Sequence, residues 1–407
     1  MHLNQQYLII ITLMFVGLLF STVLLSFSVL LFCCLALFKF EKNKISINNE
    51  FILKCKSAFF NKGYWAFSLL FICVFINPFG GDDYTYLFER IQIKLPFLIL
   101  PFAFLAFTSV AKKSIVRLFQ IFLFIILGVQ FYSCVPYFND PEFYQELLRK
   151  GQSIETPGNH IRFSLLSSLT ILGALHYMVI NGERSYKILF GVLIFISILL
   201  LHMIGVRTGL LIFYSGVLIY SILFITYKKN KLLLLLFGFF VFVLPILFYN
   251  LSDGFRNKID YMKYDIQQFK EGKGQNYADS GRLVSLDIGY KLWKERKVFG
   301  VGYTNIRPRV NDAIAEYYPG YHSNLLPHNQ FLFALTATGL FGFICFIIGL
   351  IYPWIKNRKT LSIYQLTMLF GFIICLMIDH LFEGTVGVIS FLLFMFLGSK
   401  NNETIEF

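Results

Sequence analysis

Residues 330–354 read QFLFALTATGLFGFICFIIGLIYPW, an apolar run that contains no charged residue. A helix needs about 20 apolar residues to cross the hydrocarbon core of a bilayer, so this run predicts one transmembrane helix. Comparable runs recur along the chain, at 64–80, 95–111, 116–136, 161–181, 186–204, 207–226, 231–249, 362–380 and 384–399. The sequence therefore predicts a protein that crosses a membrane many times.

The first apolar run extends from Tyr7 to Phe40 and is too long for a single helix. Polar residues interrupt it near its middle, at Phe20-Ser21-Thr22, and we expect the chain to turn there and form a hairpin of two helices. With the other runs this gives about 12 transmembrane helices. The predicted fold class is an all-α polytopic membrane protein.

The composition agrees with a membrane protein. Of the 407 residues, 57% are hydrophobic and only 14% are charged, which is more apolar surface than a water-soluble core can bury. The net charge of +13 does not indicate nucleic-acid binding, because the basic residues gather in short links between apolar runs. These links, at 42–62, 112–113, 184–187, 228–231 and 356–359, predict which ends of the spans are cytoplasmic.

The predicted spans divide the chain into three parts. Residues 1–249 hold transmembrane helices 1–9, residues 250–329 form one large extracytoplasmic loop with short helices, and residues 330–407 hold helices 10–12 and a cytoplasmic tail. Within the loop, helical stretches are expected near Phe255–Lys270 and Arg282–Arg296, on either side of Gly272-Lys273-Gly274. A loop of this length in a compact protein is usually functional or disordered, and its many aromatic residues argue against disorder.

Three residues that the topology places on the outer membrane face are candidates for catalysis. His328 precedes the span at 330–354, and a helix start favours the neutral, base-competent form of imidazole. Arg207 opens the span at 207–226, and Arg282 lies in the large loop. Guanidinium groups match phosphate oxygens, so the set suits a diphosphate leaving group and a nucleophile that must lose a proton. Each residue alone also fits a structural role, as a helix anchor, a snorkelling arginine or a solvated charge.

Further polar residues lie at span ends on the same face. Asn329 is expected to orient His328 or to cap the helix, and Arg162 and Glu383 are candidates for substrate binding because ions near membrane depth usually have partners. His160, Asp379 and His380 are secondary candidates at the same span ends, and for His160 and His380 an ordinary interfacial role is the favoured interpretation. The sequence shows no Asp, Asn and Glu cluster of the kind that binds Mg²⁺, so neither a metal nor a cofactor is expected.

Several short motifs resemble those of the O-antigen ligases, a family that shares its carboxyl-terminal region with O-antigen polymerases and some protein O-glycosyltransferases. They are His328-Asn329-x-x-Leu332, Thr338-Gly339-Leu340-Phe341-Gly342, Gly281-Arg282, Phe299-Gly300-Val301-Gly302-Tyr303-Thr304-Asn305 and Arg207-Thr208-Gly209-Leu210. The resemblance covers about 155–400. Two departures, Ser285-Leu286 where the family often has Trp and Val298 where it often has Pro, affect the loop but none of the candidate catalytic residues.

This resemblance implies a GT-C-like fold in the bacterial inner membrane. It also implies that a glycan is transferred, with inversion, from an undecaprenyl-diphosphate carrier to an acceptor sugar hydroxyl, such as that of lipid A-core, at the periplasmic face. His328 would be the general base, with positioning of donor or acceptor as the alternative role, and Arg207 and Arg282 would neutralise the diphosphate. A polysaccharide polymerase or a protein O-glycosyltransferase of the same superfamily remains an alternative.

The strongest alternative that is not an enzyme is a flippase for a lipid-linked sugar. Such a transporter would carry charged residues along several helices in the middle of the membrane. Here the conspicuous charges gather at the outer boundary, which favours the enzyme.

Overall fold

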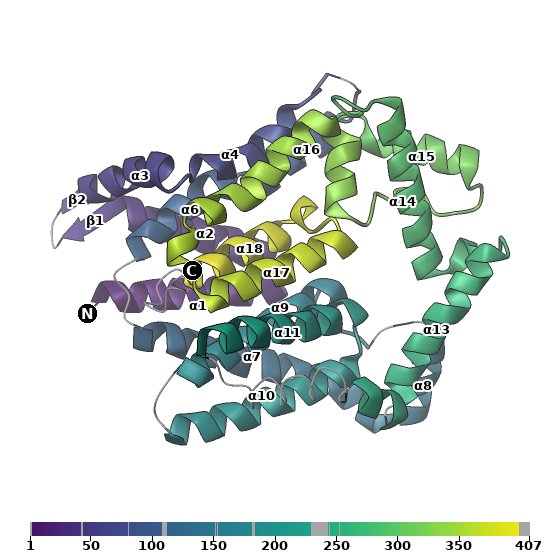
Figure 1. Cartoon of the computed structure of the whole chain (residues 1–407), viewed down its shortest axis with the longest axis horizontal. Helices are drawn as coiled ribbons and strands as arrows, with labels where there is room; N and C mark the ends of the chain where they lie inside the picture. Colours follow the sequence, from purple (N-terminus) through teal and green to yellow (C-terminus); the bar gives the residue numbers. More distant parts are fainter. Residues whose placement is uncertain are drawn as a thin grey trace.

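The computed structural model describes residues 2–41, 44–79, 81–107, 112–150, 152, 154–180, 184–228, 243, 245–251 and 253–398. Apart from one pair of short strands, the ordered elements of this part of the chain are helices (Figure 1). The strands β1 (Phe38–Glu41) and β2 (Lys44–Ile47) pair antiparallel, with Phe38 opposite Ile47. The fold is therefore all-α in character, as predicted.

The first apolar run forms the predicted helical hairpin. Helix α1 (His2–Phe20) ends before Ser21, and α2 (Thr22–Leu37) begins directly after it, with the Ser21 side chain accepting a hydrogen bond from the backbone N–H of Leu24. The two helices approach closely at Gly17, where an added Cβ would lie 2.6 Å from the backbone nitrogen of Leu25. A hydroxyl at the helix start and a glycine at the crossing thus make the reversal possible.

Five helices are long and apolar enough to cross a membrane, over Lys113–Asn139, His160–Ile180, Lys187–Ile204, Arg207–Thr226 and Gln330–Lys356, and a bent pair raises the number to six if it is one span. They belong to α7 (Lys112–Asn139), α9 (His160–Ile180), α10 (Arg184–Ile204), α11 (Arg207–Lys228) and α16 (Gln330–Lys356). Two further apolar helices, α17 (Ile363–Ile378) and α18 (Thr385–Leu397), are shorter. Most of the predicted span at 231–249 lies outside the described residues.

Two predicted spans differ from the helices that the structure contains. The run at 64–80 forms only α4 (Trp65–Ile72) and the 3-10 turn η1 (Cys73–Phe75), which together bend by 78° from α3 (Asn49–Asn61). The run at 95–111 forms α6 (Pro96–Ala106), which follows α5 (Tyr84–Lys94). Two residues with left-handed backbone bound the first of these segments, Gly63 before α4 and Asn77 after η1. Pro96 stands at the first position of α6 and marks its start.

Helix α18 lies at the centre of the bundle, and every residue from Val386 to Leu397 is buried. Its sequence is apolar on all sides, as expected for a helix surrounded by other helices. The helices α8 (Pro141–Arg149), α13 (Asp253–Lys270), α14 (Ala278–Glu295) and α15 (Ile306–Tyr317) gather at one end of the bundle (Figure 1). Helices α13, α14 and α15 come from the predicted large loop, and α8 comes from the link between the apolar runs at 116–136 and 161–181. Together they cover the bundle end at which α9, α11 and α16 begin.

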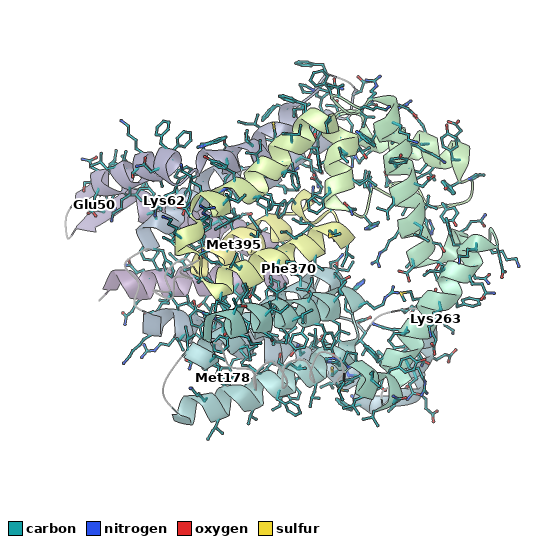
Figure 2. The ribbon with its side chains drawn as sticks, in the orientation of Figure 1. Glu50, Lys62, Met178, Lys263, Phe370 and Met395 are labelled. Atoms are coloured by element: carbon teal, nitrogen blue, oxygen red, sulfur yellow. The ribbon has the colours of Figure 1, made fainter. Side chains whose placement is uncertain are left out.

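Side chains from neighbouring helices fill the interior of the bundle (Figure 2). Phenylalanine and tyrosine rings make many of these contacts, among them the stacked pair of Phe15 and Phe122 and the stacked pair of Phe104 and Phe396. This packing fixes the ends of α9, α11, α16 and α17 relative to one another, and the candidate site lies at those ends.

Candidate active site

Arg207 is positioned by a tight reversal between α10 and α11. Gly205 adopts a left-handed conformation, with φ of 64°, and α11 begins two residues later at Arg207. The ammonium group of Lys258, on α13, donates a hydrogen bond of 3.0 Å to the carbonyl of Ile204 at the end of α10. A glycine after the last turn and a cation near the free carbonyl groups both stabilise the end of a helix. The contact of Lys258 with the end of α10 also brings Lys258 beside Arg207.

Asp265 holds the start of α14, which carries Asp279 and Arg282. Its fully buried carboxylate accepts hydrogen bonds from the backbone N–H groups of Asp279, at 2.7 Å, and Ser280, at 3.1 Å. The Ser280 hydroxyl also donates to it. Because these N–H groups have no partner inside the helix, the carboxylate satisfies them and fixes the orientation of α14.

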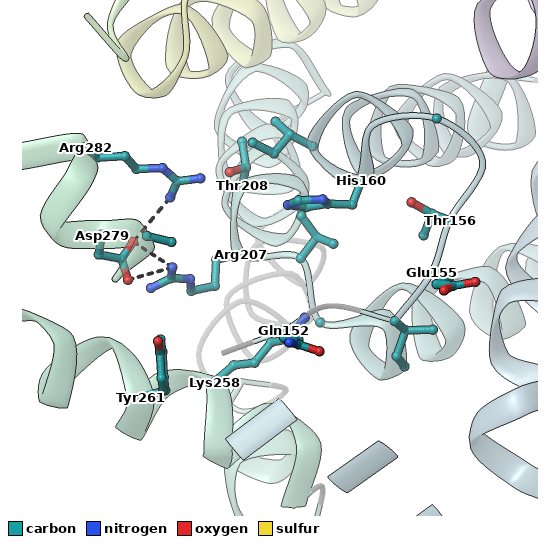
Figure 3. A pocket seen from close by; sticks show the side chains of 16 residues that line it. Gln152, Glu155, Thr156, His160, Arg207, Thr208, Lys258, Tyr261, Asp279 and Arg282 are labelled. Atoms are coloured by element: carbon teal, nitrogen blue, oxygen red, sulfur yellow. Dashed lines mark hydrogen bonds and ion pairs between the residues drawn. The ribbon is translucent and has the colours of Figure 1, made fainter. Parts of the chain in front are cut away.

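Asp279 joins the two arginines that the sequence places on the same face. Nη2 of Arg207 lies 2.8 Å from both carboxylate oxygens of Asp279, and Nη1 of Arg282 lies 3.3 Å from one of them (Figure 3). The Arg207 and Arg282 side chains are 35% and 28% exposed, and that of Asp279 is 13% exposed. The guanidinium groups therefore converge and remain accessible, as expected of an anion site.

A pocket of about 540 Å³ opens beside these residues. Figure 3 shows Arg207, Arg282, Lys258 and His160 around it, with the carboxylates of Asp279 and Glu155 also in its lining. The sequence analysis did not single out Lys258. Burial, and to a lesser extent the charge of Arg207, lowers the pKa of Lys258 to about 8. Three cations against two carboxylates leave this pocket with a net positive charge, which suits an anionic ligand.

His328 lies on the other side of α14. Its backbone N–H donates a hydrogen bond of 3.2 Å to the hydroxyl of Ser285, which in turn donates to the carbonyl of Arg282 at 2.7 Å. Ser285 therefore connects the backbone of His328 to the helical turn that carries Arg282. The serine at the position where the related family often has tryptophan thus makes a specific contact with the His328 segment.

The His328 ring is paired with Asp379, which directly follows α17. Nδ1 of His328 lies 3.3 Å from Oδ1 of Asp379, and the His380 ring lies 5.2 Å from the His328 ring between centroids. Burial raises the pKa of the Asp379 carboxyl, but the hydrogen bond from His328 and the nearby charges of His380 and His328 outweigh it and lower the pKa to about 2. From the sequence, Asp379 is only a secondary candidate and an interfacial role is favoured for His380, because only the fold brings these two residues to His328.

The same three residues are the described group that could hold a metal ion. One ligand atom each from His328, Asp379 and His380 lies within 4.8 Å of the others. Two imidazoles and a carboxylate suit zinc or another transition metal better than magnesium. The expectation that the site functions without a metal therefore has to be tested by experiment.

Asn329 caps the start of α16, which is one of the two roles expected for it from the sequence. Its side-chain oxygen accepts a hydrogen bond of 3.0 Å from the backbone N–H of Leu332, and its amide donates a hydrogen bond of 2.9 Å to the carbonyl of Met377. The first contact stabilises the helix start, and the second ties it to the last turn of α17. Asn329 thereby fixes the distance between His328 and Asp379.

Two of the glycine motifs pack against each other behind the site. Helix α16 has a non-helical residue at Gly339, with φ of 63°, which leaves neighbouring backbone groups without partners inside the helix. The backbone of the 297–302 segment supplies these partners: Val301 and Gly302 donate to the carbonyls of Thr336 and Ala337, each at 2.9 Å. A Cβ at Gly300 would lie 2.5 Å from the carbonyl carbon of Ala337, so glycine is required for this approach.

Glu383 lies in a buried network and not in the open pocket. Its carboxylate is 2.7 Å from the ammonium group of Lys94 and accepts a hydrogen bond of 3.0 Å from the Gln330 amide, and Lys94 also contacts the Tyr303 hydroxyl. The Lys94 and Glu383 side chains are only 6% and 2% exposed. These contacts fix the turn between α17 and α18 that carries Asp379 and His380.

Arg162 lies near this turn, on α9. Its guanidinium group packs against Gly384, where an added Cβ would overlap it. It does not line the pocket around Arg207, but a second pocket described below. The structure therefore groups the predicted residues into three neighbouring sets: the Arg207 and Arg282 pocket, the His328 and Asp379 pair, and the turn contacted by Arg162.

The fold and the site together define a multi-pass membrane protein with a pocket lined by two arginines and with a histidine paired to an aspartate. Residues 189–347 match the family described as O-antigen ligase, in agreement with the resemblance of the motifs. The match includes Arg207, Arg282, His328 and Asn329. No curated protein sequence matches the chain.

Proposed function

We propose that the protein transfers a glycan from an undecaprenyl-diphosphate carrier to the hydroxyl of an acceptor sugar, in a metal-independent reaction of the O-antigen ligase type, with lipid A-core as the acceptor. The observation that carries the proposal is the convergence of Arg207 and Arg282 on one pocket, next to the helix that contacts the His328 backbone. Charged donors fixed before the reaction stabilise a departing diphosphate without reorganising.

In this reaction the acceptor oxygen forms a bond to the anomeric carbon while the bond from that carbon to the diphosphate oxygen breaks. The diphosphate leaves with the electron pair of the broken bond and is neutralised by Arg207 and Arg282. The Asp379 carboxylate accepts a hydrogen bond from the Nδ1–H of His328, which leaves the unprotonated Nε2 to take the proton of the acceptor hydroxyl and form an imidazolium. Attack from the face opposite the diphosphate inverts the anomeric configuration.

The proposed location is the bacterial inner membrane, with about 12 transmembrane helices in a GT-C-like arrangement and the site facing the periplasm. Labelling of intact cells with a membrane-impermeant maleimide tests this topology, in a variant that lacks the seven native cysteines. A cysteine at Glu271, between α13 and α14, should react, and one at Arg358, after α16, should react only after permeabilisation. Labelling of the Arg358 site in intact cells would contradict the proposed orientation.

The activity is tested with purified protein, an undecaprenyl-diphosphate-linked glycan and each of three acceptors: lipid A-core, a second carrier-linked glycan and a protein. Transfer to lipid A-core is the expected result. Transfer to only the second carrier-linked glycan would make the protein a polymerase, and transfer to only the protein would make it a protein O-glycosyltransferase. Translocation of the donor without any transfer would favour a flippase instead.

A further inference from the structure

We propose that a second pocket, lined by Arg162, binds an anionic group carried by the acceptor glycan. The inference rests on the proposed function, because it assigns the acceptor to one side of the reaction centre and the donor diphosphate to the other. The second pocket has a volume of about 590 Å³ and lies between the α1–α2 turn and the start of α9. Its lining includes Phe20, Ser21, Arg162, Leu166 and Val386.

The start of α9 forms the wall between the two pockets. His160 and Ile161 line the pocket of Arg207 and Arg282, whereas Asn159 and Arg162 line the second pocket, and Gly158 lines both. Residues at consecutive positions of a helix start point in different directions, so one turn of α9 presents a different side chain to each pocket. The two pockets are thus separate sites that share one wall.

Arg162 is the charged residue among those that line the second pocket. Within the described part of the chain, no hydrogen bond or ion pair engages its guanidinium group. The carboxylate of the nearby Glu383 is already paired with Lys94 at 2.7 Å. A half-buried guanidinium without a carboxylate partner is costly at membrane depth, and an anionic ligand would offset this cost through two parallel hydrogen bonds.

The position of Arg162 connects this pocket to the reaction centre. Its guanidinium group lies against Gly384, in the same turn between α17 and α18 as Asp379 and His380. An acceptor anchored on Arg162 would therefore be held beside the turn that orients His328. The diphosphate would bind across the wall, where Arg207, Arg282 and Lys258 lie. The lining of Phe20, Leu166 and Val386 provides apolar contacts of the kind that the carbon face of a sugar ring makes.

The test uses full-length protein in a neutral detergent, with glucose 6-phosphate and glucose as probes and calorimetric titration as the measurement. Glucose 6-phosphate should bind, and glucose should bind at least about 10-fold more weakly, because hydrogen bonds to charged groups contribute about 1.5–3 kcal/mol. Arg162→Gln should remove this difference, and Arg162→Lys should restore only part of it. Binding of glucose 6-phosphate to Arg162→Gln with wild-type affinity would overturn the proposal.

Gly384→Ala is a second variant that leaves Arg162 in place. Its methyl group would displace the guanidinium, while the extended backbone at this position, with φ of −133°, accepts alanine. It should weaken glucose 6-phosphate binding in the same direction as Arg162→Gln. Unchanged binding in this variant would contradict the location of the anion at Arg162. The comparison remains informative even if one of the two variants does not fold.

A matched control separates this proposal from the proposed function. Arg207→Gln should lose binding of inorganic pyrophosphate and keep binding of glucose 6-phosphate, whereas Arg162→Gln should do the reverse. Loss of both ligands in Arg207→Gln would show one shared site and overturn the second pocket. Wild-type pyrophosphate binding in Arg207→Gln would instead contradict the donor site of the proposed function, without affecting the Arg162 result.

Nanodiscs distinguish an acceptor from a lipid headgroup as the source of the anion. In phosphatidylcholine nanodiscs, glucose 6-phosphate should bind as in detergent, and adding phosphatidylglycerol should change its affinity less than twofold. Strong competition by phosphatidylglycerol that disappears in Arg162→Gln would assign the pocket to an anionic lipid and overturn the acceptor proposal. In turnover assays, Arg162→Gln should raise KM for an anionic acceptor more than it lowers kcat.

Discussion

Nδ1 of His328 lies 3.3 Å from Oδ1 of Asp379, although the two residues are separated by the whole of α16 and α17. A carboxylate that accepts a hydrogen bond from Nδ1–H fixes the tautomer of the imidazole and leaves Nε2 unprotonated, as a general base requires. The pairing explains why a histidine at a helix start would act as a general base here. In the proposed mechanism it also gives a role to Asp379, which the sequence presents only as a polar residue at a span end.

Loss of the imidazole should abolish turnover but not donor binding. We expect His328→Ala to reduce kcat by about 10²–10⁴-fold, the usual contribution of general base catalysis. Asp379→Asn should also reduce kcat, since the amide cannot stabilise the imidazolium that forms. Both variants should bind the carrier-linked donor like the wild type in a filter or fluorescence assay. Loss of donor binding in His328→Ala would make the residue a diphosphate ligand.

Lysine should replace either pocket arginine poorly, although it keeps the charge. Two guanidinium groups converge on Asp279 in the structure, and an ammonium group cannot reproduce their fork. We expect Arg207→Lys and Arg282→Lys each to raise the Kd for inorganic pyrophosphate about 10-fold or more. Arg309→Lys, in the exposed part of α15, is the matched control and should leave the Kd unchanged. A wild-type Kd in Arg282→Lys would show that Arg282 contributes its positive charge and not the geometry of its guanidinium group.

Donor affinity should fall as the pH rises through about 8. The pKa of Lys258 is lowered to about 8, so its ammonium group is charged below that pH and loses its proton above it. The diphosphate diester of the donor keeps a constant charge over this range, so the change reports on the protein. Binding measured between pH 6.5 and 9.5 should show the decrease in the wild type, and Lys258→Met should bind weakly at every pH. A decrease that persists in Lys258→Met would assign the titration to another group.

Chelators should leave transfer unchanged, because the expected mechanism requires no metal. His328, Asp379 and His380 are nevertheless close enough to bind one ion. If zinc enters this group it occupies the base, and micromolar zinc should then inhibit the wild type and inhibit His380→Ala less. The measurement is turnover with EDTA or with added zinc. Activity that disappears in EDTA and returns with a metal would make the ion part of the mechanism.

Breaking the Lys94 and Glu383 ion pair from one side should destabilise the protein strongly. Lys94→Met would leave the carboxylate of Glu383 buried without its cation, which typically costs about 3–5 kcal/mol. The double variant Lys94→Met/Glu383→Gln removes both charges and should recover most of the lost stability. Thermal unfolding in detergent, followed by tryptophan fluorescence, measures the effect. Equal stability of Lys94→Met and the double variant would show that the two charges do not depend on each other.

The positions of most helices could be predicted from the sequence, because apolar runs report directly on burial in a bilayer. This reasoning found the hairpin at Ser21 and the long helices α7, α9, α10, α11 and α16. At 64–80 the apolar composition continues past the residues at which the backbone breaks the helix, and at 95–111 the described part of the run forms the helix α6. Hydropathy depends on the side chains alone, so it does not detect a residue with a left-handed backbone conformation such as Asn77.

Sequence by itself also determined the candidate residues Arg207, Arg282 and His328, since Arg207 and His328 stand at the edges of apolar runs and Arg282 lies in the large loop on the same predicted membrane face. Only the tertiary structure decided their partners: Asp279 between the two arginines, Asp379 beside His328, and Lys94 against Glu383. Local patterns record which residues enter the membrane, whereas ion pairs between distant segments depend on how the helix ends meet. The relative positions of the helix ends are set by side-chain packing throughout the bundle, so no single stretch of sequence determines them.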